Sequence, residues 1–254
     1  MEKIKSIAIT GKGGTGKTMV ATLMIKILAE RLYGKVLAID ADSAMSLPYT
    51  LGIKVKKTVS DMRKEIIGIE QVKRQIDSKP LKTVMEDIIE NGNGFGLLTM
   101  GRPEEPGCYC VVNDLLRYGI DSLIEAYDIT IIDGEAGPEQ LNRRVLKSID
   151  TLLVIADMSK RSLETAGAIM RIAQSKNSGI NVKNSGLILN RVRDDEMDTS
   201  IELNNKTGMN ILGCIPEDNI LNSYDRAGMP LLNLPEDALS LTAARKILDK
   251  IIPL

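Results

Sequence analysis

The feature that most constrains the fold of this chain is a glycine-rich segment between an apolar β-branched run and a helical pattern. It reads Gly11-Lys12-Gly13-Gly14-Thr15-Gly16-Lys17-Thr18 and fits the phosphate-loop pattern of Gly, four residues, Gly, Lys and Ser or Thr. Glycines let successive backbone N–H groups curl around a β-phosphate, and the following helix directs its positive end at the anion. In this pattern Lys17 reaches the β- and γ-phosphates, and the Thr18 hydroxyl ligates Mg²⁺. The segment therefore predicts a nucleotide-binding α/β fold.

Apolar strand patterns alternate with helical patterns along the 254 residues. Near-continuous apolar strands separated by helices indicate a doubly wound, mostly parallel sheet that is covered on both faces. No linker-like stretch divides the chain, so we expect a single P-loop ATPase domain over residues 1–254. Within it, the charged, helical stretch 54–93 is expected to be an insertion or a mobile region. The expected strands are 4–10, 35–39, 96–100, 129–132, 152–156, 186–189 and 211–215, and the clearest helices are 17–32, 111–125, 162–174 and 239–252.

Composition excludes several classes of function. The chain has no histidine, which excludes Ser-His and Cys-His catalytic pairs and imidazole metal ligands. Its 33 basic and 34 acidic residues nearly cancel, and one Phe and six Tyr offer few stacking surfaces, so we expect no nucleic-acid partner. Three cysteines are too few for a disulfide framework, and we recognise neither a signal peptide nor a membrane-spanning run. These observations predict a cytoplasmic protein without a membrane partner.

Carboxylates stand at the ends of two predicted strands. Asp40 and Asp42 follow the second strand, and Asp133 follows the strand at 129–132. In open parallel sheets, ligands bind at the carboxyl edge of the strands, which is where these side chains should meet. Asp133 is in the Walker B arrangement and would hold Mg²⁺ through a water molecule. Asp42 could instead cap a turn or a helix.

Glu135 lies two residues beyond Asp133 and has two interpretations. It is either a second carboxylate on the metal side of the site or the ion-pair partner of Arg143 or Arg144. The sequence alone leaves both open.

Two cysteines lie close together in the segment Pro106-Gly107-Cys108-Tyr109-Cys110. In an extended segment, this spacing puts both side chains on one face. A closed tetrahedral site for a soft metal needs four ligands, and two chains facing each other across a twofold axis would supply them. The alternatives are two unligated structural cysteines or a redox-active pair. The third cysteine, Cys214, lies in an apolar strand and is expected to be a buried small hydrophobe.

A second lysine in the phosphate loop, Lys12, gives the loop a family signature. The loop resembles the KGGxGK[ST] signature of the deviant Walker A ATPases, the class of MinD, ParA and the nitrogenase iron protein. The resemblance implies a homodimer that forms on ATP binding, with Lys12 reaching the partner's nucleotide; in a plain phosphate loop it would be solvated. It also implies that Asp40 lies near Mg²⁺ and that Asp42 positions or activates the attacking water.

The resemblance extends to the base. Asn190 matches the adenine-reading Asn of this class, and Pro216 and Glu217 belong to an Ile-Pro-Glu-Asp loop that lines the base in those proteins. The chain lacks an Asn/Thr-Lys-x-Asp guanine motif. ATP is therefore the expected nucleotide, with Mg²⁺ as its metal.

From residue 4 to about residue 230, the chain resembles the CooC-type ATPases, which handle nickel in the maturation of carbon monoxide dehydrogenase and acetyl-CoA synthase. The resemblance rests on the phosphate loop, the Cys-Tyr-Cys motif and Asp133-Gly-Glu-Ala-Gly-Pro-Glu-Gln-Leu-Asn-Arg-Arg144. It implies an ATP-driven metallochaperone in which Cys108 and Cys110 of both subunits bridge Ni²⁺, or Zn²⁺ since thiolates bind both. An apo metalloenzyme would be the client.

Two departures from the CooC pattern leave the client open: Met19 replaces the usual second Thr, and Gln140 stands where His is frequent. Two other classes stay open beside this one. They are a MinD/ParA-like positioning ATPase acting on a membrane or on DNA, and an electron-transfer ATPase with an iron–sulfur cluster between its subunits.

Overall fold

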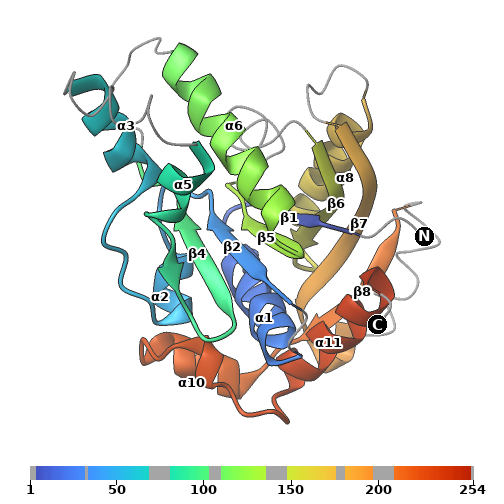
Figure 1. Ribbon diagram of the computed structural model, residues 1–254. Helices are drawn as coiled ribbons and strands as arrows, with labels where there is room; N and C mark the ends of the chain where they lie inside the picture. Colours follow the sequence, from blue (N-terminus) through green and yellow to red (C-terminus); the bar gives the residue numbers. More distant parts are fainter. Residues whose placement is uncertain are drawn as a thin grey trace.

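The computed structural model describes residues 4–31, 34–68, 81–102, 110–135, 148–175, 181–196 and 209–252; the side chains of 67–68, 81–82 and 110–117 are also left aside. An eight-stranded sheet forms the centre of the molecule, and helices cover both of its faces (Figure 1). The strand order is β3-β4-β2-β5-β1-β6-β7-β8. The short pair β3–β4 is antiparallel and every other neighbouring pair is parallel. The predicted doubly wound, mostly parallel sheet is thus confirmed.

All seven expected strands are present, with bounds shifted by a few residues. The strands are β1 Ser6–Gly11, β2 Val36–Asp40, β3 Glu90–Asn91, β4 Phe95–Thr99, β5 Ile129–Asp133, β6 Ser148–Ala156, β7 Asn181–Val192 and β8 Ile211–Pro216. The α-helices are α1 Lys17–Glu30, α2 Leu47–Leu51, α3 Val59–Gly68, α5 Leu81–Glu86, α6 Cys110–Ala126, α8 Lys160–Gln174, α10 Asn219–Arg226 and α11 Leu239–Ile251. Two short 3₁₀ turns are η1 Asp194–Glu196 and η2 Leu231–Asn233.

The two faces of the sheet make two separate cores, because successive side chains of a strand point to opposite sides. Ile7 and Ile9 of β1 lie in the core formed with α1, α2, α10 and α11. Ala8, between them, lies in the core formed with α3, α5, α6 and α8. Both faces are therefore apolar, which explains why the central strands are continuous hydrophobic runs instead of alternating ones.

Helix α1, which follows the phosphate loop, is buried on nearly every side. The sequence pattern predicts one apolar face, but Ile25 and Lys26 outside that face are buried as well. Helix α1 packs between the sheet and the helices α2 and α11, so it has core on two sides. The ammonium group of Lys26 is held there by Glu30, by Glu236 at 3.2 Å and by the carbonyl oxygen of Leu232 at 3.0 Å. Helix α1 is therefore fixed by apolar packing along its length and by these polar contacts in its second half.

The strand register brings the carboxyl ends of β1, β2, β4 and β5 to one edge. Asp40 lies opposite Asp133 on one side and opposite Thr99 on the other. Gly11, at the end of β1, pairs with Ile155 of β6. This edge is where the phosphate loop and the predicted carboxylates meet.

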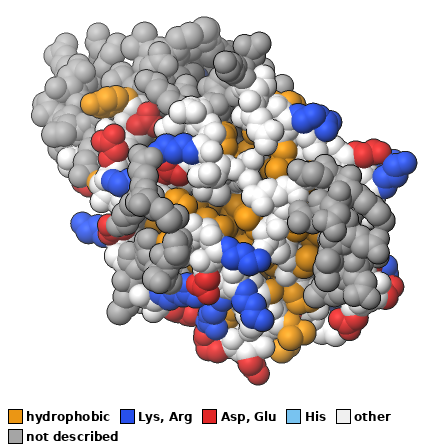
Figure 2. Space-filling view, turned by 90° about the vertical axis from the view of Figure 1, so that its right-hand side faces the viewer, with side chains coloured by type: hydrophobic (Ala, Val, Ile, Leu, Met, Phe, Trp, Pro, Cys, Tyr) orange, Lys and Arg blue, Asp and Glu red, His pale blue; other side chains and the backbone are white. Residues whose placement is uncertain are grey.

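The surface of the described residues carries both signs of charge. On the face shown in Figure 2, Lys and Arg side chains lie intermixed with Asp and Glu below a band of apolar side chains. No helix within the described ranges is both long enough and apolar enough to cross a membrane.

Candidate nucleotide site

The phosphate loop, residues 11–18, has the backbone shape that its glycines permit. Gly16 caps α1 with φ 88°, and a Cβ atom there would lie 2.4 Å from the Nδ2 atom of Asn190. Gly11 has φ 151°, and a Cβ atom would lie 2.2 Å from the carbonyl oxygen of Ile155. Both positions therefore require glycine. The Thr15 hydroxyl donates to the carbonyl oxygen of Lys12 at 2.8 Å and closes the turn.

The two lysines of the loop have different surroundings. Lys17, the first residue of α1, is only 8% exposed, and its ammonium group acts to lower the pKa of the buried Asp133. Lys12 is partly exposed at the tip of the loop. Burial works against ionisation of Asp157, but hydrogen bonds from Ser159 and the positive charge of Lys12 lower its pKa. Lys17 thus points into the site, while Lys12 lies at its outer rim near the end of β6.

Asp40 and Asp133 form a buried carboxylate pair at the ends of adjacent strands. Burial, followed by the charge of Asp133, raises the pKa of Asp40 to about 7. Burial also raises the pKa of Asp133 to about 7, although the Thr18 hydroxyl and the Lys17 ammonium act in the opposite direction. Two carboxylates that are neighbours on adjacent strands and are shielded from water do not readily carry two negative charges at once unless a cation is bound.

The geometry of this pair fits a hard divalent cation. The backbone N–H groups of Asp42 and Leu47 donate to Asp40 at 3.0 and 3.2 Å, which fixes its orientation. Neither oxygen of Asp133 makes a hydrogen bond of ordinary length within the described part of the chain, although both oxygens are buried. Buried carboxylate oxygens beside the Thr18 hydroxyl are the kind of oxygen ligand that Mg²⁺ prefers.

Asp42 lies in the loop that follows β2. Its carboxylate accepts the backbone N–H of Ala44 at 2.9 Å, and its charge acts to raise the pKa values of both Asp40 and Asp133. Asp42 therefore faces the metal side of the site while also closing a turn. Met45 in the same loop has φ 54°, a left-handed conformation that costs a non-glycine residue about 1 kcal/mol.

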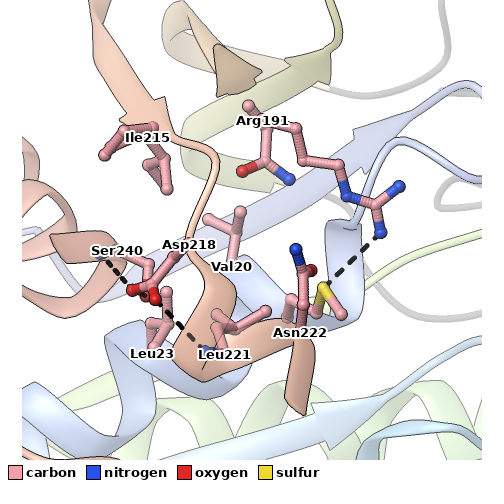
Figure 3. A pocket seen from close by; sticks show the side chains of 11 residues that line it. Val20, Leu23, Arg191, Ile215, Asp218, Leu221, Asn222 and Ser240 are labelled. Carbon is pink, nitrogen blue, oxygen red and sulfur yellow. Dashed lines mark hydrogen bonds between the residues drawn. The ribbon is translucent and has the colours of Figure 1, made fainter. Parts of the chain in front are cut away.

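A small pocket lies beside the phosphate loop, between the ends of β7 and β8 and the helices α1 and α10 (Figure 3). The side-chain amide of Asn190, from β7, donates to the carbonyl oxygen of Thr15 at 2.8 Å. Arg191, with φ 57°, also lines this pocket. One of its guanidinium nitrogens donates to the carbonyl oxygen of Gly14 at 3.2 Å, and the other contacts the Met19 sulfur at 3.7 Å. Pro216, at the end of β8, lines the pocket as well.

These features are those of a nucleotide-binding domain, and comparison with known proteins agrees. The model of the CobQ/CobB/MinD/ParA nucleotide-binding domain family, CbiA, matches residues 6–231. The chain belongs to this family. An uncharacterized ATP-binding protein of Methanocaldococcus jannaschii is 37% identical over 250 residues, 97% of this chain and 98% of that protein.

Two further proteins are similar to this chain. The carbon monoxide dehydrogenase accessory protein CooC of Rhodospirillum rubrum is 27% identical over 244 residues, 90% of this chain and 89% of that protein. The septum site-determining protein MinD of Pyrococcus horikoshii, solved with Mg-ADP, has a TM-score of 0.70 at 24% identity, over 97% of this chain and 95% of that one. That second likeness shows the shared fold.

The MinD/ParA fold brings together most of the residues that the sequence singles out. The phosphate loop, Asp40, Asp42 and Asp133 meet at one edge of the sheet, with Asn190 and Pro216 in the adjoining pocket. The Glu217 side chain is exposed, and its backbone N–H donates to the carbonyl oxygen of Val192 at 2.9 Å.

Met19, Arg191 and Asp218 line the pocket but were not named as site residues, although Asp218 ends the Ile-Pro-Glu-Asp loop quoted above. Met19 and Arg191 contact each other, and Asp218 holds the wall of the pocket. Asp218 accepts the N–H groups of Ile220 and Leu221 at the start of α10, and both the N–H and the hydroxyl of Ser240 at the start of α11. An aspartate just before a helix is an N-cap signal that could have revealed it.

The cysteines of the predicted metal site fall mainly outside the described residues. Cys108 lies outside them, and Cys110 is the first residue of α6. Arg143 and Arg144, the suggested partners of Glu135, also lie outside; Glu135 accepts a hydrogen bond from the Ser43 hydroxyl. Cys214 of β8 is only partly buried, so the expectation of a buried side chain was wrong; it packs against one of the two cores.

Proposed function

We propose that this protein is a Mg²⁺-dependent ATPase that dimerises on ATP binding and acts as a nickel metallochaperone for a carbon monoxide dehydrogenase-type metalloenzyme. One observation carries the ATPase part. The buried carboxylates Asp40 and Asp133 lie near Lys17, and Lys17 is at the end of the phosphate loop. The 27% identity with a CooC accessory protein and the Cys108/Cys110 pair support the nickel part.

Each residue has a role in this proposal. The loop 11–18 binds the phosphates through its backbone N–H groups, and Lys17 compensates the negative charge that develops on them. Thr18 and Asp133 hold Mg²⁺, which supplies charge neutralisation of the phosphates when bound, and Asp40 supports it. Asp42 orients the attacking water, and Lys12 contacts the nucleotide of the second subunit.

The base site is part of the same proposal. Asn190 reads the adenine edge with its amide, while Pro216 and Glu217 border the base. Arg191 lines the same pocket and is hydrogen-bonded to the carbonyl oxygen of Gly14, so it would border a bound base as well.

The cargo is nickel, held by Cys108 and Cys110 of both subunits in a site that ATP-driven closure assembles and hydrolysis loosens. Zn²⁺ would bind the same thiolates, so the metal has to be measured. The chain is proposed to act as one domain in the cytoplasm, with residues 54–93 as a variable segment.

One experiment tests the whole proposal. Mass in solution and nickel per chain are measured with ADP and with ATP, for the parent, for Cys108→Ser/Cys110→Ser and for Cys214→Ser. We expect one nickel per ATP-dependent dimer, and we expect the double variant to lose it. Cys214→Ser should keep the nickel; it is the control, because it makes the same Cys-to-Ser change elsewhere in the chain.

The outcomes separate the competing classes. ATP-dependent dimers without cysteine-dependent metal would contradict the chaperone role and favour a positioning ATPase. Broad visible absorbance after anaerobic purification, with iron and sulfide bound, would instead identify an iron–sulfur ATPase.

A further inference from the structure

Ser43 lies next to Asp42 and contacts the loops that follow two other strands. Its hydroxyl donates a hydrogen bond to Oε1 of Glu135, two residues after the end of β5. Its carbonyl oxygen accepts a hydrogen bond at 3.1 Å from Nε of Arg102, three residues after the end of β4. Ser43 thus connects the loops that follow β2, β4 and β5, at the sheet edge where the phosphate loop lies (the nucleotide edge).

Each of these loops is anchored where it leaves the sheet. The N–H of Ala41 donates to the carbonyl oxygen of Asp133 at 2.9 Å, and the N–H of Met100 donates to that of Asp40 at 2.9 Å. The Thr10 hydroxyl donates to the carbonyl oxygen of Glu135 at 3.1 Å. Farther from the sheet than these anchors, the two hydrogen bonds of Ser43 also connect the loops. Ser43 directly follows Asp42 in the chain.

The position of Ser43 also connects the site with the cysteine segment. Arg102 is followed directly by residues 103–109, which include Cys108. The hydrogen bond from Arg102 to the Ser43 carbonyl oxygen therefore joins the Asp42 loop to the residue directly before that segment.

We propose that Ser43 is a positioning residue: through Glu135 it orients Asp42 for hydrolysis, and through Arg102 it transmits the nucleotide state to the segment that carries Cys108. The second part rests on the proposed nickel function, while the first rests only on ATP hydrolysis. A serine that merely completes a turn would affect folding, but it would not change kcat at constant KM.

The hydrolysis part is tested by a double-mutant cycle of Ser43→Ala and Glu135→Ala. Each single change is expected to lower kcat about fivefold or more with KM for ATP within about twofold, and the double variant should be no slower than the slower single one. Ser43→Thr and Glu135→Gln keep a donor and an acceptor and should restore most of the rate. Thr165→Ala removes a hydroxyl from the exposed side of α8 as the matched control.

The transmission part is tested with Arg102→Gln and nickel itself. In the parent we expect nickel retention per dimer to differ between ADP and ATP, and in Ser43→Ala and Arg102→Gln that difference should fall by at least about half. Additive effects on kcat, an effect on KM alone, or an unchanged ADP/ATP difference in both variants would overturn the proposal. A parent that hydrolyses ATP but holds no nickel refutes the chaperone function and the transmission part, while the double-mutant cycle still decides the positioning part. A parent without ATPase activity refutes both the proposed function and this inference.

Discussion

The two carboxylates Asp40 and Asp133 lie on adjacent strands without exposure to solvent, and this makes the stability of the metal-free protein depend on pH. Burial raises both pKa values to about 7, above the ordinary value of 3.8. A carboxyl group with a raised pKa holds its proton in the folded state over a range in which the unfolded chain has lost it. Its destabilising effect is therefore absent below about pH 4, grows as the pH rises, and is complete above about pH 7.

Replacing one member of the pair should remove much of this effect. We expect Asp133→Asn, in a chelator, to raise the free energy of unfolding at pH 8 by about 2 kcal/mol, or Tm by roughly 4–8 °C. The gain should be clearly smaller at pH 5, since the folded parent is then largely protonated. Thermal melts at both pH values measure it, with the exposed Asp237→Asn as the control. An equal gain at both pH values would show that the carboxylates do not titrate as described.

At this scale, sequence reasoning predicts the position of a residue where that position depends on neighbours in the chain. The phosphate loop is defined by eight consecutive residues, and each strand-end carboxylate by the run that precedes it. It does not reveal contacts between distant residues, such as the hydrogen bond from the Asn190 amide to the carbonyl oxygen of Thr15 across 175 positions of sequence. Arg191 and Met19 meet over a similar separation, and no local pattern marks that contact.

Among the elements, α10 and α11 are joined at their first turns by one carboxylate. Burial opposes the ionisation of Asp218, but hydrogen bonds from Ser240 and from the start of α10 lower its pKa. Ionised Asp218 therefore stabilises the fold above about pH 4, and this contribution is lost as the pH falls through its lowered pKa.

We expect Asp218→Asn to destabilise the protein by about 1–2 kcal/mol at pH 7 and to lower Tm by roughly 2–8 °C, because a charged helix cap becomes a neutral one. The difference from the parent should shrink on acidification. Melting curves at pH 7 and pH 3.5 measure it, with Asp225→Asn, an exposed aspartate of the same helix, as the control. Since Asp218 also lines the pocket that we propose for the base, weaker ATP binding should accompany the change. A variant that melts like the parent would show that Asp218 does not stabilise the contact between the first turns of α10 and α11.

The elements missed from the sequence are short ones. Strand β3 has two residues, and its antiparallel pairing with β4 is made through a glycine-rich turn without any alternating pattern. Helix α2 has five residues and α10 has eight, which is too little chain to establish a helical period. The long elements were predictable because each buries a whole face or, for α1, nearly its whole surface.

At the scale of the whole molecule, strand ends that are far apart in the sequence form the nucleotide edge. Lys12 places a positive charge at the outer rim of this edge. Its ammonium group is partly exposed and helps to lower the pKa of Asp157, while Lys17 is buried behind it. A lysine placed in this way adds little to binding within one subunit, but it is available to a second subunit that approaches this edge. The proposed dimer therefore predicts different consequences for the two lysines.

We expect Lys12→Ala to bind ATP within about threefold of the parent, since the loop backbone and Lys17 are unchanged. It should fail to dimerise with ATP, and its hydrolysis should fall by about tenfold or more, because a charge acting on the transition state is lost. Sedimentation with ATP and with ADP, together with steady-state hydrolysis, measures both effects. Lys54→Ala, an exposed lysine elsewhere, is the matched control. A Lys12→Ala protein that dimerises and hydrolyses ATP like the parent would show that Lys12 is a solvated loop residue and that subunits do not share the site.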